Sequence, residues 1–193
     1  MTGRFSTLIG ADAIPRCGWV GNDPEYERYH DAEWGRPLHG DRPLFEKIAL
    51  EGFQAGLSWI TILRRRDAFR EAFHGFAIER VAAMEPADID SLLLDDRIIR
   101  NRAKIEATIA NARITLKLAE GELDSVVWSC APAPGRPRPR SVAEVPAVTA
   151  ESTALSAALR SRGYRFVGPT TMYALMQSAG LVDDHVVGCH RSS

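Results

Sequence analysis

Apolar residues recur at helical intervals along most of this chain, and that pattern constrains the fold more than any other feature. Leu44, Ile48 and Ala55 lie four and seven positions apart. The longest regular stripe covers residues 98–116, and a shorter helix is expected before it, over 88–94. No segment alternates apolar and polar residues over a length that would require a sheet. The sequence therefore predicts a mainly α fold.

The size and composition of the chain are those of a globular domain. Of its 193 residues, 45% are hydrophobic and 25% are charged, so it can bury a core without disulfide bonds. No apolar run approaches the ~18 residues that a membrane helix needs. The start of the chain lacks the features of a secretory signal. We therefore expect a cytoplasmic protein that does not contact a membrane.

Charge and cysteine content narrow the function further. The formal net charge is −1, so the chain as a whole does not attract polyanions, and any contact with nucleic acid would have to come from local features. Three cysteines without an export signal favour a metal site or free thiols over a disulfide framework.

The segment 129–150 interrupts the helical pattern. Its five prolines are Pro132, Pro134, Pro137, Pro139 and Pro146, and its interleaved arginines are Arg136, Arg138 and Arg140. Prolines at this density cannot continue a helix, so an extended loop is expected. Two roles are open for it: a solvated connector, or an arm that contacts phosphates.

Two short helices are expected after this loop. Ser152 or Thr153 is suited to cap the first of them. The second begins at Pro169, which is tolerated in a first helical turn, with Gly168 before it as a cap. The segment 154–179 therefore reads as two helices joined by a tight, glycine-bounded hairpin.

Four residues with metal-ligand chemistry lie near the two ends of the chain. Cys17 and His30 are in the first part, and His185 and Cys189 are near the end. The spacing of the second pair suits one helical face or one tight turn. Two thiolates and two imidazoles complete a tetrahedral structural zinc site with no open position. Packing in the core is the alternative for each residue, and His190 is a competing ligand for the place of Cys189.

A carboxylate, Glu51, lies on the apolar face of the helix predicted around Leu44. A carboxylate there either reaches water at the edge of the stripe or is buried with a partner. Gly52 and Gly56 are costly inside a helix, so we expect the chain to end or bend near Gly56, shortly before Trp59.

Four aromatic residues with polar groups cluster before this helix, at Trp19, Tyr26, Tyr29 and Trp34. Buried indole N–H and phenol O–H groups need hydrogen-bond partners. The cluster is therefore either ordinary core or the wall of a pocket in which Glu51 reads a flat heteroaromatic ligand.

Five blocks of the sequence are informative together. They are CGW at 17–19, YHDAEWG at 29–35, EGFQAGLSW at 51–59, FVGPTT at 166–171 and GLVDDHVVGC at 180–189. In this order they resemble the 3-methyladenine DNA glycosylase I family. The resemblance implies a helix-hairpin-helix DNA glycosylase fold, in which a zinc site joins the N- and C-terminal segments. It implies an N-terminal tail over 1–16 and a single helical domain over 17–193.

The resemblance also implies roles for individual residues. The four ligands of one structural Zn²⁺ would be Cys17, His30, His185 and Cys189. Glu51 matches the carboxylate that hydrogen-bonds the excised base. Trp59 matches its stacking partner, and Tyr26, Tyr29 and Trp34 surround the pocket.

DNA contacts are implied at two loops. Leu57 matches the loop that such enzymes insert into the base stack, and Gly56 lets the backbone approach closely. Val167, Gly168 and Thr170 belong to the hairpin, whose backbone N–H groups would bind phosphate at the start of the next helix. Such binding needs no net positive charge.

Two positions differ from related superfamily members. Members that also cut the strand have a lysine where this chain has Thr170, so we expect a monofunctional glycosylase. Many members carry an essential Asp where this family usually has Asn, and this chain has Asp183. Asp183 either acts in catalysis, on water or on the sugar cation, or caps a helix beside the zinc site.

The function implied is hydrolysis of the N-glycosidic bond of 3-methyladenine in double-stranded, alkylated DNA, with free 3-methyladenine as product and a monomer as the acting species. The alternative is a non-catalytic, zinc-stapled module that binds nucleic acid. A hydrolase with catalytic zinc is disfavoured, because four protein ligands leave no open coordination position.

Overall fold

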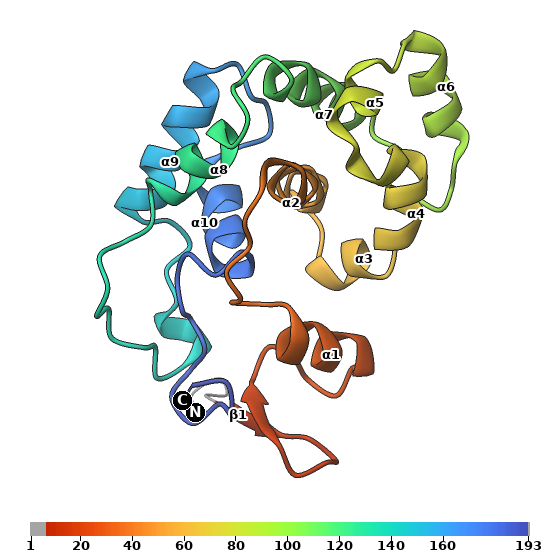
Figure 1. Ribbon diagram of the computed structural model, residues 1–193. Coiled ribbons are helices and arrows are strands. Elements are labelled where there is room, and N and C mark those ends of the chain that lie inside the picture. Colours follow the sequence, from red (N-terminus) through yellow and green to blue (C-terminus); the bar gives the residue numbers. More distant parts are fainter. Residues whose placement is uncertain (1–6, 193) are drawn as a thin grey trace.

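The computed structural model describes residues 7–192, and helices dominate it (Figure 1). Its α-helices are α1 (Pro24–Ala32), α2 (Asp41–Gln54), α3 (Trp59–Leu63), α4 (Arg66–Ala72), α5 (Ile78–Ala82), α6 (Pro86–Leu94), α7 (Arg102–Thr115), α8 (Glu122–Trp128), α9 (Ala150–Ser161) and α10 (Pro169–Ser178). Two 3-10 turns, η1 (His74–Phe76) and η2 (Val142–Glu144), and two strands, β1 (Thr7–Ile9) and β2 (Pro15–Cys17), complete these elements. The predicted mainly α fold is confirmed.

Helix α2 lies at the centre of the molecule, with α3, α7, α8 and α10 packed around it (Figure 1). Its sequence explains this position, because apolar side chains occur on more than one face. Leu44, Phe45, Ile48, Leu50 and Phe53 are all fully buried. Glu51 is thereby carried into the interior, since it shares a helix that is surrounded on all sides. Burial of such side chains contributes about 1.5–3 kcal/mol each.

A small sheet near the chain ends differs from the predicted N-terminal tail. Strands β1 and β2 pair antiparallel, with Thr7 opposite Cys17. Three-residue strands are too short to produce a recognisable alternation, so the sequence pattern missed them. The amide of His190 donates to Pro15 O at 2.8 Å, which places the C-terminal segment beside this hairpin (Figure 1). Residues 1–6 of the predicted tail lie outside the described part of the chain.

Helices α9 and α10 pack against each other, and α10 also packs on α2. The predicted cap of α9 is wrong. The cap is Thr149, whose Oγ1 accepts from Ser152 N at 3.2 Å while Ser152 Oγ accepts from Thr149 N at 2.9 Å. This reciprocal pair starts the helix at Ala150, earlier than predicted. Helix α10 begins at Pro169 with Gly168 as its cap, as expected.

No helix in the described part of the chain is long and apolar enough to cross a membrane. Apart from η2 and the first residue of α9, the segment 129–150 contains no helix or strand, and it begins with a turn at residues 129–130. It leaves α8, passes close to the C-terminal segment and returns to α9 (Figure 1).

Candidate functional site: a Cys/His cluster beside an aromatic cavity

The four predicted metal ligands converge in the interior. Cys17, His30, His185 and Cys189 are all buried, and their ligand atoms lie within 4.8 Å of one another. Cys189 Sγ is 3.4 Å from His30 Nε2, and His185 Nδ1 is 3.7 Å from both sulfurs. A tetrahedral zinc ion with bonds of about 2.0–2.3 Å separates its ligands by similar distances. The donor set and its spacing therefore fit zinc.

The surroundings orient these ligands. His30 Nδ1 lies 2.8 Å from Asp31 Oδ1, so Nε2 faces the cluster, and Asp31 is itself held by Arg16. The pKa of Cys189 is lowered, because the Cys17 side chain and then the two imidazoles contact its sulfur. A thiolate at this position is what a metal ion requires.

Local backbone decides between the alternatives left open for this cluster. His185 and Cys189 belong to a turn, not to a helix. His190 lies outside the four-residue group: its Nε2 is 3.4 Å from Asp31 Oδ1 and its Nδ1 is 3.1 Å from Pro15 O. Cys189, and not His190, therefore completes the four-residue group.

A cavity of about 200 Å³ lies next to the cluster. Its lining residues are Trp19, Tyr26, Tyr29, Trp34, Glu51, Gln54, Trp59, Val142, Val145, Ala174, Gln177, Ser178, Asp184 and Val186. All five residues predicted to form a base pocket are among them, namely Tyr26, Tyr29, Trp34, Glu51 and Trp59. The structure thus favours the pocket over ordinary core.

Glu51 lies in this wall at 3% exposure. Its Oε1 accepts from Ser178 Oγ at 2.9 Å, whereas Oε2 is buried and has no hydrogen-bond partner among the described residues. Burial raises the pKa of Glu51 to about 7, against the opposing effects of Lys47 and Ser178. A buried acceptor without a partner is costly, so a group that enters the cavity and donates to Oε2 would be bound favourably.

The ring system beside Glu51 has the shape of a stacking site. The Tyr29 and Trp59 rings lie 5.6 Å apart at 42°. Tyr26 OH accepts from the amide of Ile60 at 2.9 Å, which fixes α3 and hence Trp59. Trp59 Nε1 is buried and has no partner among the described residues, so it is a second polar atom left for a ligand.

Lys47 is a residue of this site that the sequence analysis missed. Its Nζ donates to Tyr29 OH at 3.3 Å and lies 5.0 and 5.2 Å from the centres of the Tyr29 and Trp59 rings. Lys47 lines a neighbouring cavity of about 280 Å³, and Ser178 lines both cavities. Its position four residues before Glu51 on one helix was the available signal, because that spacing places both on one face.

Two neighbouring acidic residues, Asp183 and Asp184, directly precede His185 and have different surroundings. Asp183 is half-exposed; its Oδ1 accepts from His185 N at 3.1 Å and its Oδ2 pairs with Arg138 at 2.5 Å. Asp184 is buried and lines the cavity, and its Oδ2 accepts from Tyr173 OH at 2.6 Å. Asp183 therefore stabilises the turn and is not among the residues that line the cavity.

The two predicted DNA loops lie beside the cavity. Gly56 has a φ of +84°, and Leu57 after it is 42% exposed. Both line a further cavity of about 220 Å³ together with Glu51 and Thr170. Lys104 Nζ donates to Phe53 O and Ala55 O at 2.9 and 2.6 Å. These two backbone carbonyls at the end of α2, just before Gly56, therefore have a hydrogen-bond partner.

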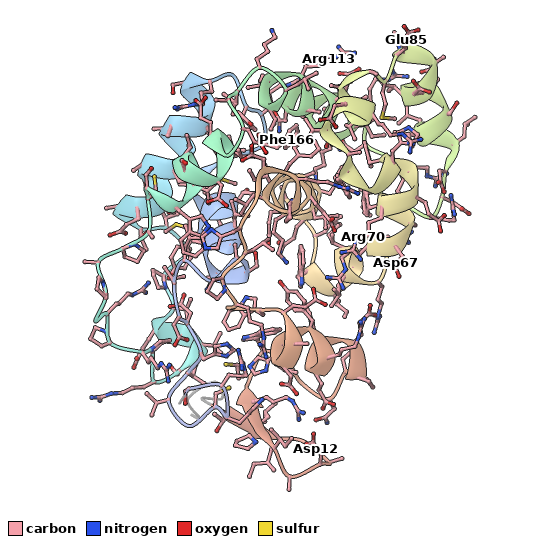
Figure 2. The ribbon with its side chains drawn as sticks, in the orientation of Figure 1. Asp12, Asp67, Arg70, Glu85, Arg113 and Phe166 are labelled. Atoms are coloured by element: carbon pink, nitrogen blue, oxygen red, sulfur yellow. The ribbon has the colours of Figure 1, made fainter. Side chains whose placement is uncertain are left out.

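The hairpin before α10 presents backbone and small side chains. Val167 is buried, so only its main chain is available, whereas Thr170 is exposed. Phe166 has a φ of +57° and lies beside α2 (Figure 2), where a Cβ added at Gly52 would be 3.4 Å from Phe166 Cβ. Gly52 thus faces the hairpin, at a separation that leaves room for a methyl group in van der Waals contact.

Comparisons with known proteins identify relatives of this chain. A family model described as methyladenine glycosylase matches residues 19–192. DNA-3-methyladenine glycosylase 1 of Escherichia coli (strain K12) is 49% identical over 179 residues, covering 91% of this chain and 96% of that protein. A crystal structure of 3-methyladenine DNA glycosylase I has a TM-score of 0.87 at 47% identity and covers 91% and 98% of the two chains.

A second solved structure is a variant of 3-methyladenine DNA glycosylase I in complex with 3-methyladenine. It has a TM-score of 0.85 at 36% identity and covers 92% of this chain and 97% of that one. With a family model spanning nearly the whole chain and relatives at close to half identity, this chain belongs to the methyladenine glycosylase family.

Proposed function

We propose that this chain is a DNA glycosylase that hydrolyses the N-glycosidic bond of 3-methyladenine in alkylated, double-stranded DNA. The observation that carries the proposal is the buried, unpartnered Oε2 of Glu51 in a cavity walled by Tyr29 and Trp59. Relatives named for the same activity support it.

The chemistry of the damaged base suits this cavity. Methylation at N3 gives the purine a positive charge while it is attached to the sugar, so the base leaves readily without being protonated. A cation is attracted to indole and phenol faces by about 0.5–2 kcal/mol, and to an ionised Glu51 as well. An undamaged, neutral adenine lacks both attractions, so selectivity rests on the charge of the ligand.

Hydrolysis proceeds by breaking the bond between C1′ and the base. The bonding electrons leave with the base, which departs as neutral 3-methyladenine, while oxocarbenium character develops on the sugar. Water adds to C1′ and loses a proton. Before this step the nucleotide is extracted from the base stack, at a cost of a few kcal/mol. We assign the space left in the stack to the exposed side chain of Leu57.

The remaining contacts follow from the hairpin and the metal cluster. Backbone N–H groups at Val167, Gly168 and Thr170 bind a phosphate at the start of α10. Thr170 has no amine with which to form a Schiff base, so the enzyme is monofunctional. A Zn²⁺ held by the four-residue cluster supplies structural cross-linking, because two thiolates and two imidazoles fill its coordination. We propose a monomer with the helix-hairpin-helix glycosylase fold.

A release assay tests this function. DNA treated with a methylating agent is incubated with the protein, and free bases are separated by chromatography. We expect 3-methyladenine in the supernatant and intact strands until alkali is added. Absence of free base in the presence of bound DNA would instead identify a non-catalytic binding module.

A further inference from the structure

One wall of the aromatic cavity comes from the proline-rich segment, which the proposed function does not use. Val142 and Val145 line the cavity together with Glu51. They belong to what we call the strap, residues 136–145, which includes η2. The rest of the lining comes from the N-terminal region, α2, α3, α10 and the turn of the metal cluster. Both valines are apolar, so they contribute shape and not hydrogen bonds.

The first arginine of the strap attaches it to the cavity wall. Arg136 Nη1 donates to Tyr173 OH at 2.9 Å, and Arg136 Nη2 lies 3.5 Å from Asp184 Oδ1. Tyr173 OH in turn donates to Asp184 Oδ2 at 2.6 Å. Asp184 is itself a lining residue, so Arg136 joins the strap to a part of the cavity wall that comes from the C-terminal segment.

A second set of contacts attaches the strap to the metal turn. Arg138 pairs with Asp183 at 2.5 Å, and Val187 N donates to Pro139 O at 2.9 Å. Asp183 and Val187 flank the predicted zinc ligand His185. Carboxylates therefore pair with Arg136 and Arg138, two of the three arginines that suggested an arm that contacts phosphates.

The strap is stiff as well as attached. Pro137 and Pro139 fix the backbone on both sides of Arg138. Within the strap, Arg140 N donates to Glu144 Oε2 at 2.7 Å, which closes the turn that carries Val142, and Val145 N donates to Val142 O at 3.3 Å. A wall built in this way has little freedom to move aside for a larger ligand.

We propose that the strap is a size filter, in which Val142 and Val145 limit the purines that the cavity accepts to those with one small alkyl group. This inference rests on the proposed function, since it assigns the cavity to the excised base. One methylene more or less in an apolar pocket changes relative affinity by about 10- to 200-fold. If the two lining valines contact the bound purine, they are therefore sufficient to separate methyl from propyl.

The experiment compares Val142→Ala, Val145→Ala and the double variant with the full-length parent protein. The ligands are free adenines with methyl, ethyl or propyl at N3, and 3-methyladenine with a further methyl at N6. Equilibrium binding is measured by quenching of tryptophan fluorescence. The N3 series compares methyl, ethyl and propyl, and the N6 series compares 3-methyladenine with and without the further methyl. In the double variant, we expect the affinity for the larger ligand of at least one series, relative to 3-methyladenine, to increase at least about tenfold.

Two further variants complete the test, one that makes the cavity smaller and one that serves as a control. Val142→Leu adds one methylene and should lower affinity for ethyl before methyl. Val148→Ala is the matched control, because Val148 lies in the same loop and is exposed to a degree similar to Val142, 44% against 36%, but is not a lining residue. Equal ligand ratios in parent, double and Val142→Leu proteins that melt alike would overturn the proposal, as would binding of no purine by the folded parent. Base release from DNA is measured separately, so failure of the proposed function alone would appear as selective binding without release.

Discussion

The Cys/His cluster and the aromatic cavity are neighbours, and they differ in how their buried polar atoms are partnered. Tyr29 lines the cavity and His30 joins the cluster; Asp184 lines the cavity and His185 joins the cluster. In the cluster the ligand atoms converge within 4.8 Å. In the cavity, Glu51 Oε2 has no partner among the described residues.

This difference separates stability from function. In the proposed function, the converging side chains would hold one ion and so cross-link the N-terminal and C-terminal segments. The cavity instead keeps a carboxylate in an unfavourable setting. The folded pKa of Glu51, about 7, exceeds its ordinary 4.5. Its contribution to stability is therefore best below pH 4.5 and is lost as pH rises through 7, at a cost of about 3 kcal/mol.

The largest expected effect breaks the cluster. Cys189→Ala should abolish stoichiometric zinc and lower the free energy of unfolding by about 5 kcal/mol, since the cross-link closes a loop of most of the chain. Metal analysis and denaturant titration measure both. The control is Cys130→Ala, at a half-buried thiol outside the cluster. A variant that is as stable as the parent after losing its metal would contradict the structural role.

The next effect breaks the cavity and leaves the cluster intact. Glu51→Gln should reduce release of 3-methyladenine about 100-fold, yet raise the melting temperature at pH 8, because no buried charge has to form. Zinc content should stay unchanged. Glu46→Gln is a control on the same helix, at a carboxylate that pairs with Arg70 and does not line the aromatic cavity. Equal release by a folded, zinc-loaded Glu51→Gln protein is the outcome that the account does not survive.

A smaller effect sharpens the electrostatics of the cavity. Lys47 favours the ionised form of Glu51. Lys47→Met should therefore raise the pKa of Glu51 further and move the acid limb of the activity profile upward by about one pH unit. Lys117→Met, at an exposed position, is the control for loss of charge. Superimposable profiles for parent and Lys47→Met would show that the ammonium does not act on this carboxylate.

The smallest expected effect is that of Asp183, which lies in sequence next to the cavity residue Asp184 and close to the cluster residue His185. Asp183 Oδ1 accepts from the His185 amide and Oδ2 accepts from Arg138, so Asp183→Asn retains the first hydrogen bond and loses the second together with its ion pair. We expect release to change less than about twofold. A large fall in the single-turnover rate, with stability unchanged, would instead assign Asp183 a catalytic role.

Local features of the fold could be predicted from the sequence, and long-range ones largely could not. The stripe around Leu44 predicted α2, and the start of α10 at Pro169 was predicted by backbone chemistry. The cap at Thr149 was missed because Ser152 is also a good cap residue, and only the reciprocal hydrogen bonds decide between them.

The site divides in the same way. Residue types alone indicated Glu51, because a carboxylate is unusual on an apolar helix face. They also indicated the four predicted metal ligands, because cysteine and histidine have metal-ligand chemistry. The resemblance to a known family brought them together. Ser178 and Val145 carry no chemical signal of their own, because a serine or a valine at these positions is ordinary. Their roles arise only from the packing of α10 and the strap against α2.

The most direct test of the central claim is the pH dependence of kcat/KM for release of 3-methyladenine, which reports ionisation in the free enzyme. If an ionised Glu51 reads the charged base, kcat/KM rises about tenfold per pH unit up to pH 7 and is level above it, and this limb is absent in Glu51→Gln. A parent profile that is flat from pH 5 to 8, or an identical limb in Glu51→Gln, would contradict the account.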